Sequence, residues 1–299
     1  MERYVVGFLM AFAIWAQAPG VPVSTVVTLE ARRGKTIPAI EAKDIRVEQG
    51  KQQRPVTGLK PLDTGDSLQL MLLIDDSARG SFDAEIPTLQ KWVDRIPPNA
   101  EVAVAYMRNG MAVVTSHFTK DHTAAAKGIR VAAGPGNVNP YESLEDAIKK
   151  WPQGGSAGRK IVVMISSGIE GLGGGYNSDN PYVTAGIRAA QKAGVVVYGI
   201  YSPSIGHAGH SLWRSTWGQN FLSQLSDETG GESYIIGFGS PVSFQPFLDS
   251  IFQRLQHQYL LTFDARPEQK AGLQPVRIYI PEKDASIAAP DKVYVPASL

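Results

Sequence analysis

A nearly unbroken apolar run from Leu68 to Asp75 (LQLMLLID) places the strongest constraint on how this 299-residue chain can fold. A strand of this composition carries apolar side chains on both faces, so both faces have to be covered by other elements. Residues 160–166 (KIVVMIS) and 194–201 (GVVVYGIY) have the same character. Such strands are typical of mostly parallel sheets with helices on either side, which predicts an α/β fold.

Helical patterns alternate with these strands between residues 67 and 257. Apolar residues recur at helical spacing from Ile86 to Ile96 and from Phe244 to Leu255, and residues 121–132 are also helix-like. The turn RNG joins two further strands, and we expect this pair to form a hairpin. The alternation predicts a doubly wound, mostly parallel sheet of the Rossmann-like type.

The regions on either side of this α/β region have the pattern of β-structure. Residues 21–66 contain short strands separated by turns, and residues 258–299 contain the strands QYLLTF, PVRIYI and KVYVP. We expect the first and last segments to pair with each other in a small sandwich. The α/β region, residues 67–257, would then emerge from it as an insertion.

The N-terminus has the features of a signal peptide. Val5 to Trp15 is an apolar run too short to span a membrane, and Ala16 to Ala18 (AQA) is a small-x-small cleavage signal. A buried N-terminal strand or helix is the alternative interpretation. The pattern favours a signal peptide over residues 1–20 and export to the periplasm or the outside, with no membrane span in the mature chain.

Composition and motifs argue against several classes of function. Lys and Arg total 29 and Asp and Glu 28, so the net charge gives no reason to expect nucleic acid as a partner. The absence of Cys excludes disulfides and thiolate chemistry. No nucleophile elbow or Walker A motif occurs. We therefore expect no enzymatic activity, although sequence distance alone leaves a triad involving Ser166 or Ser167 open.

The segment that ends the first buried strand, LIDDSARGS, resembles the metal loop of von Willebrand factor A (VWA) domains, whose pattern is D-x-S-x-S. The whole chain resembles the secreted VWFA-related proteins of Acidobacteria. The resemblance implies a VWA fold, export, and binding of a partner protein at the carboxyl edge of the sheet through Mg²⁺ or Mn²⁺. The further motifs that carry it are KDIRVEQGKQQ (43–53), LSDETGGESY (225–234), QYLLTF (258–263) and DKVYVP (291–296).

Carried over onto this chain, the metal pattern of the family is incomplete. Asp75 and Ser77 match its first two ligands, whereas Arg79, Glu142 and Ser167 stand where the family has Ser, Thr and Asp. The resemblance therefore implies a degenerate adhesion site that binds a protein, with no cofactor expected. If Mg²⁺ or Mn²⁺ does bind, the ligands would be Asp75, Ser77 and Glu142. The partner-binding residues expected at this site are Asp75, Asp76, Ser77, Arg79, Glu142 and Ser167.

Arg79 is the residue that most directly opposes a metal ion. A guanidinium about 4 Å from a divalent cation is repelled by roughly 8 kcal/mol at an effective dielectric constant near 20. We expect Arg79 to occupy the cation position and to pair with Glu142 or Asp75. The alternatives are a weakened but working Mg²⁺ or Mn²⁺ site, a loop with no role, an unrecognised hydrolase site, and a purely structural module.

Two further features lie between the strand 194–201 and the next helix. His207 and His210 (GHAGH) lack the additional ligands of a metal site and predict a solvated loop. Trp213 and Trp217 follow closely, on what we expect to be the same loop. Exposed aromatic residues of this kind indicate a binding surface, and packing onto the domain is the alternative.

Overall fold

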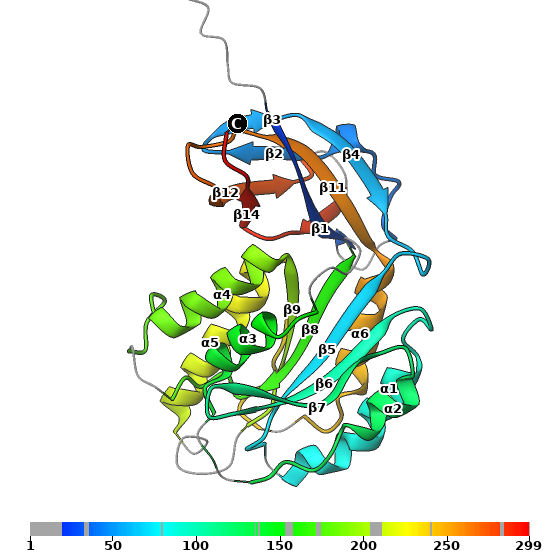
Figure 1. Ribbon diagram of the computed structural model, residues 1–299, viewed down its shortest axis with the longest axis vertical. Helices are drawn as coiled ribbons and strands as arrows, with labels where there is room; N and C mark the ends of the chain where they lie inside the picture. The colour runs from blue at the N-terminus through cyan, green and yellow to red at the C-terminus, as the bar shows by residue number, and fades with distance from the viewer. Residues whose placement is uncertain are drawn as a thin grey trace, which may run out of the picture.

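The chain folds into a β-sandwich and an α/β part, and the sandwich sits at one end of the α/β part (Figure 1). None of the helices in the described segments is long and apolar enough to cross a membrane. Arg79, His207, His210 and residues 1–19 of the expected signal peptide lie outside the described residues. The computed structural model describes residues 20–32, 36–78, 80–134, 136, 138–152, 158–171, 175–203, 211–239, 241–281 and 284–298.

The α/β part is built on a six-stranded sheet with the order β10-β9-β8-β5-β6-β7. All neighbouring strands are parallel except β6 and β7, which form the expected antiparallel hairpin. The fold class predicted from the sequence is confirmed. The strands are β5 (Leu68–Asp75), β6 (Glu101–Arg108), β7 (Met111–Thr119), β8 (Arg159–Ser166), β9 (Val195–Tyr201) and β10 (Ser233–Tyr234).

Helices cover both faces of this sheet, as the apolar character of β5 requires. Leu70, Leu72 and Ile74 face a core with α1, α2 and α6, and Met71 and Leu73 face a second core with α3, α4 and α5. A short 3-10 helix, η3 (Gly80–Glu85), precedes α1. The helices are α1 (Ile86–Asp94), α2 (His122–Lys127), α3 (Pro140–Lys149), α4 (Pro181–Ala193), α5 (Leu212–Glu228) and α6 (Gln245–Gln256).

Two predictions about helix boundaries were wrong. The helix expected over residues 121–132 ends at Lys127 with Gly128 as its C-cap, and the chain continues in an irregular segment. Helix α5 begins at Leu212, so Trp213 and Trp217 lie on a helix and not on a loop. Ser211 caps that helix by accepting a hydrogen bond from the Arg214 N–H, which explains its early start.

The N-terminal and C-terminal β segments pair with each other, as expected. Strand β1 is antiparallel to β11 and β13, and β12 is antiparallel to β2. Two four-stranded sheets result, with the orders β13-β1-β11-β4 and β14-β12-β2-β3, and they enclose a separate apolar core. The strands are β1 (Val21–Ala31), β2 (Arg46–Gln49), β3 (Gln52–Arg54), β4 (Val56–Pro61), β11 (Gln258–Ala265), β12 (Gly272–Tyr279), β13 (Ala285–Ala288) and β14 (Lys292–Val295).

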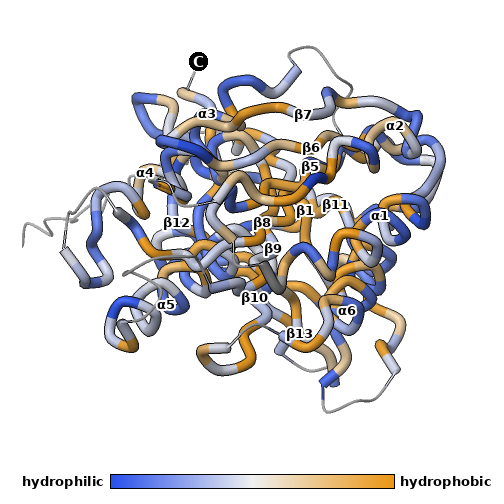
Figure 2. Tube along the Cα trace, turned by 90° about the horizontal axis from the view of Figure 1, so that it is seen from below, coloured by the Kyte–Doolittle hydropathy of each residue, from blue (hydrophilic) through white to orange (hydrophobic). Residues whose placement is uncertain are grey.

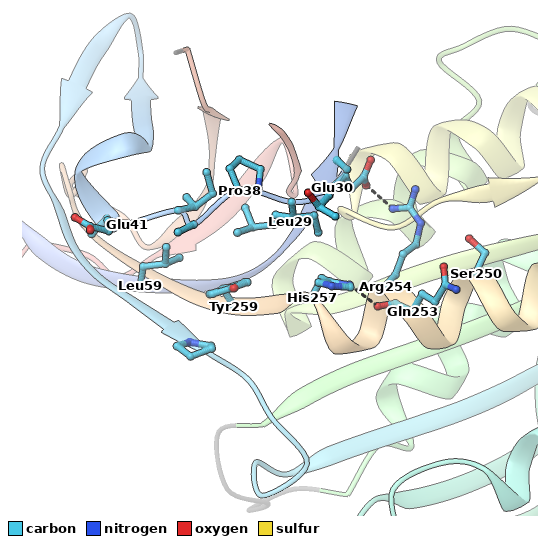
Figure 3. A pocket seen from close by; sticks show the side chains of 17 residues that line it. Leu29, Glu30, Pro38, Glu41, Leu59, Ser250, Gln253, Arg254, His257 and Tyr259 are labelled. Carbon is cyan, nitrogen blue, oxygen red and sulfur yellow. Dashed lines mark hydrogen bonds and ion pairs between the residues drawn. The ribbon is translucent and has the colours of Figure 1, made fainter. Parts of the chain in front are cut away.

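A charged contact holds the C-terminal end of α6 against the sandwich (Figure 3). Arg254 pairs with Glu30 on β1 and with Glu232, which precedes β10. Arg254 and Glu30 line an open cleft of about 1210 Å³ between α6, β1, β4 and the segment 36–42. The Arg254 guanidinium thus links α6 to β1, which is far away in the sequence, and to the segment before β10.

We expect Arg254→Ala to lower the free energy of unfolding by about 2 kcal/mol, because it leaves two partly buried carboxylates without their cation. Alanine favours helix formation, so helix propensity would not explain a loss. Urea unfolding measures the effect. The matched control is Arg95→Ala. Arg95 follows α1 and forms an exposed ion pair with Asp249 on α6, the helix that also carries Arg254. Its loss should lower the free energy of unfolding by less than about 1 kcal/mol. Equal losses in both variants would contradict a special role for Arg254.

Candidate functional site

The carboxyl ends of the parallel strands meet at the end of the α/β part remote from the sandwich. Figure 2 views the molecule from this side. Asp75 ends β5, Asp76 and Ser77 follow it, and Ser167 follows β8. Glu142 lies in the first turn of α3. In an open α/β sheet this edge is where ligands bind, and we call it the carboxyl edge.

The Asp75 carboxyl group is almost completely buried at this edge. Its Oδ1 accepts hydrogen bonds from the backbone N–H of Ser77 at 2.8 Å and from the Ser77 hydroxyl at 2.7 Å. Oδ2 is buried with no hydrogen-bond partner of regular geometry among the described residues. Burial raises the pKa of Asp75, although the Ser77 hydrogen bonds and the backbone of Ser167 favour the charged form. Asp75 is therefore a carboxyl group whose charge is poorly compensated.

The neighbouring Asp76 has the opposite electrostatic environment. Arg130 donates to both of its carboxylate oxygens, at 2.7 and 3.2 Å, and Arg108 donates to Oδ2 at 3.2 Å. The backbone N–H of Ala133 adds a bond of 2.9 Å. Burial acts to raise the pKa of Asp76, but these bonds outweigh it and hold the pKa below its usual value. The carboxylate of Asp76 is thus charged, and both of its oxygens already accept hydrogen bonds.

Arg130 is itself held in place by Tyr106 on β6. The guanidinium carbon lies 4.0 Å from the centre of the Tyr106 ring, and the Tyr106 hydroxyl accepts the Arg130 backbone N–H at 2.7 Å. The segment that follows α2 is thereby drawn against the carboxyl edge. Sequence reasoning missed Arg108 and Arg130, because one ends a strand and the other was assigned to a helix that is in fact shorter.

Ser167 adjoins Asp75 through its backbone, whereas the contacts of Glu142 in the described segments are with other residues. Glu142 Oε2 accepts a 3.4 Å bond from Asn139, and a Cβ atom added to Gly110 would come within 2.4 Å of that oxygen, so the carboxylate lies against the β6–β7 turn. The hydroxyl of Ser167 accepts the Ile169 N–H at 3.4 Å. Glu142 forms no ion pair within the described segments, and the expected pairing with Arg79 lies outside them.

The oxygen atoms at this edge are a poor match for a divalent cation. Mg²⁺ and Mn²⁺ prefer several oxygen ligands, and carboxylates are the main protein contribution. Here one orphaned oxygen of Asp75 stands beside an aspartate that two arginines already neutralise. In the described part of the chain no group of three or more His, Cys, Asp or Glu side chains could hold a metal ion. The described residues therefore do not fit the ion that the resemblance implies.

A close approach of two backbones brings helix α5 to the same edge. Gly168, in the left-handed region at φ 66°, follows β8, and a Cβ atom on it would lie 2.1 Å from the carbonyl oxygen of Gly218 in α5. Only glycine permits this contact. It fixes the N-terminal half of α5, which carries Trp213, beside the end of β8.

Most of the large exposed apolar side chains in the described segments belong to the α/β part, many of them in segments that begin or end at this edge. Trp213 is 58% exposed and its ring centre lies 4.4 Å from that of Tyr176, whereas Trp217 packs on Phe221. Of the nine large apolar side chains that are exposed in the described segments, Tyr294 alone belongs to the sandwich. We call the other eight the apolar rim: Met111, Val113, Val131, Leu212, Trp213, Ile236, Phe238 and Val242.

No family model and no curated protein matches the sequence of this chain. Solved structures similar to it include an aerotolerance-related membrane protein from Bacteroides fragilis (14% identity over 63% of this chain and 98% of that one, TM-score 0.45). A second is the vWF domain of the pilus tip protein Mfa5 from Porphyromonas gingivalis (13%, 63% and 94%, TM-score 0.46). A third is proximal thread matrix protein 1 from the mussel byssus with a zinc-occupied MIDAS motif (13%, 70% and 50%, TM-score 0.45). The fold of this chain is established by its own strand order and helix layers.

The two adjacent aspartates predict opposite effects of the same substitution. Asp75→Asn should raise the free energy of unfolding at pH 7, because it removes a buried charge and keeps the acceptor for Ser77. Asp76→Asn should lower it by about 2 kcal/mol, because it breaks the arginine pairs. Urea unfolding of both variants at pH 7 measures the difference.

The pH dependence supplies the control. The pKa of Asp75 is raised in the folded state, so its charged form destabilises the fold above that pKa. The gain in free energy of unfolding caused by Asp75→Asn should therefore shrink as the pH falls toward about 4. The pKa of Asp76 is lowered in the folded state, so this residue stabilises the fold fully above the unfolded value of 3.8. That stabilisation should be lost as the pH falls below 3.8 and through the lowered pKa. Effects of the same sign in both variants at pH 7 would contradict this account.

Proposed function

We propose that this chain is an exported, non-enzymatic protein that binds another protein through the carboxyl edge of its six-stranded sheet, without a metal ion. Export rests on the signal-peptide pattern of residues 1–20. The observation that carries the binding proposal is that eight of the nine large exposed apolar side chains in the described segments belong to the α/β part, many of them in segments that begin or end at the carboxyl edge. Such side chains mark interaction surfaces when they are grouped on one side of a protein.

The composition of the rim supports a protein as the ligand. It combines a tryptophan, a phenylalanine and a methionine with aliphatic residues, and aromatic residues and methionine are enriched at protein interfaces. Arg108 and Arg130 keep 47% and 38% of their side chains exposed beside the rim. Their remaining N–H groups can donate to a partner carboxylate or carbonyl, which is the role a metal ion has in the family that the sequence resembles.

Metal independence is tested by thermal unfolding. A ligand that binds only the folded state raises its stability. We expect the melting temperature of the wild-type chain to be the same in millimolar Mg²⁺ or Mn²⁺ as in EDTA. A metal-dependent rise that disappears in Asp75→Ala would show a working adhesion-type metal site, and the metal-free proposal would be wrong.

Partner binding is tested with variants of the rim. Proteins from the source cells are crosslinked to the wild-type chain, and the captured partner is purified and titrated against each variant in EDTA. Trp213→Ser and Phe238→Ser should each weaken binding about tenfold or more, because large exposed aromatic residues dominate interface energies. Tyr294→Ser is the matched control, since it removes an exposed aromatic residue from the sandwich. Binding that EDTA abolishes, or that Tyr294→Ser weakens as much as the rim variants do, would contradict the proposal.

A further inference from the structure

A smaller cavity lies between the sandwich and the amino ends of the parallel strands, on the opposite side of the α/β part from the carboxyl edge. It has a volume of about 430 Å³. Strands β1, β11 and β14 line it from the sandwich, and β8, β9 and the end of α4 line it from the α/β part. Ligand sites in proteins often lie between structural units and have volumes of roughly 300–1000 Å³, which includes this one.

The charged residues of this cavity are mostly cations. Asp66 is its one acidic lining residue in the described segments, and it already pairs with Lys60 at 2.6 Å. Lys292 lies 3.6 to 3.7 Å from carboxylates outside the lining. Lys160 and Lys192 form no ion pair within the described segments. The cavity therefore contains two lysines that form no ion pair with an acid of these segments.

The position of these two lysines follows from the sheet. Lys160 on β8 pairs in register with Val195 on β9. Lys192 lies in the last turn of α4, and Gly194 connects that helix directly to β9. The two side chains therefore come from neighbouring positions at one end of the cavity.

Arg159, next to Lys160, adds a buried cation. It is 3% exposed, and its guanidinium donates to the carbonyl oxygens of Leu255 at 2.8 Å and Asp63 at 2.9 Å. Its Nε has no hydrogen-bond partner, and no carboxylate of the described residues lies within ion-pair distance. Burial lowers the pKa of Arg159, and the carboxylates of Asp66 and Asp63 oppose this shift from beyond ion-pair distance. A further anion nearby would add to that compensation.

The rest of the lining combines polar residues, such as Thr25 and Thr229, with an apolar part. Val26 and Leu260 line it from the sandwich and Val196 from β9. Tyr294 on β14 also lines it and keeps 41% of its surface exposed, so its ring stands at the border with solvent. A ligand that satisfies both kinds of wall has an anionic end and a compact apolar body.

We propose that this cavity binds a small carboxylate with an apolar body, with the carboxylate held by Lys160 and Lys192 in the field of Arg159. The site is independent of the protein-binding function proposed for the carboxyl edge. If Arg159 served only to join α6 to the segment before β5, the cavity would bind no such anion, and the experiment distinguishes the two cases.

The experiment is isothermal titration calorimetry with N-acetyl-L-leucine and with N-acetyl-L-leucinamide, which has the same body without the charge. We expect saturable binding of the acid and at least about tenfold weaker binding of the amide. Inorganic phosphate should bind more weakly than the acid, since it cannot use the apolar walls. Absence of saturable binding up to about 10 mM acid, or equal affinity for acid and amide, would overturn the proposal.

Variants locate the site. Lys160→Gln/Lys192→Gln should weaken binding of N-acetyl-L-leucine about tenfold, because both cations that would contact the carboxylate are lost. Lys91→Gln/Lys127→Gln is the control, since it changes the net charge equally at two exposed lysines outside the cavity. Circular dichroism checks that both variants are folded. If the two double variants bind equally well, the acid is not bound in this cavity.

Discussion

The burial of strand β5 on both faces is the constraint from which the rest of this structure follows. The strand lies between β8 and β6, and its side chains alternate between two separate apolar cores. Helices must cover both sides, so the strands on either side of β5 run parallel to it and connect through helices. Because β5 and β8 are parallel neighbours, the polar residues at the end of β5, Asp75 to Ser77, lie at the same edge of the sheet as the residues that follow β8.

At that edge, the environments of Asp75 and Asp76 differ because their side chains leave the end of the strand in different directions. Among the described residues Asp75 accepts hydrogen bonds from neutral donors, and it is buried, so its charged form is disfavoured. Asp76 meets Arg130 and Arg108, so its charged form is favoured. Positive charge at this edge thus comes from side chains of the protein itself. The proposed binding of a protein at this edge rests on these arginines and on the exposed apolar residues of the rim.

Polar and charged groups on the amino side of the parallel sheet join the sandwich to the α/β part. Arg254 contacts Glu30, and Arg159 contacts the carbonyl oxygens of Asp63 and Leu255. This side is remote from the carboxyl edge, so the protein has two chemically different surfaces. One is the apolar rim with its exposed aromatic residues, and the other is a cavity, partly open to solvent, whose lining contains more lysine and arginine than acid.

The sequence by itself determined the α/β class, the β6–β7 hairpin and the pairing of the terminal β segments. Periodicity and apolar composition are local properties, and a run such as Leu68 to Asp75 can be buried on two faces in very few ways. It also identified Asp75, Ser77 and Ser167 as residues of one edge. Tertiary structure alone decided which charges meet there, since Asp76 and Arg130 are 54 residues apart in the chain. Ion pairs, exposed rims and cavities depend on which distant segments pack together, and no local pattern records that.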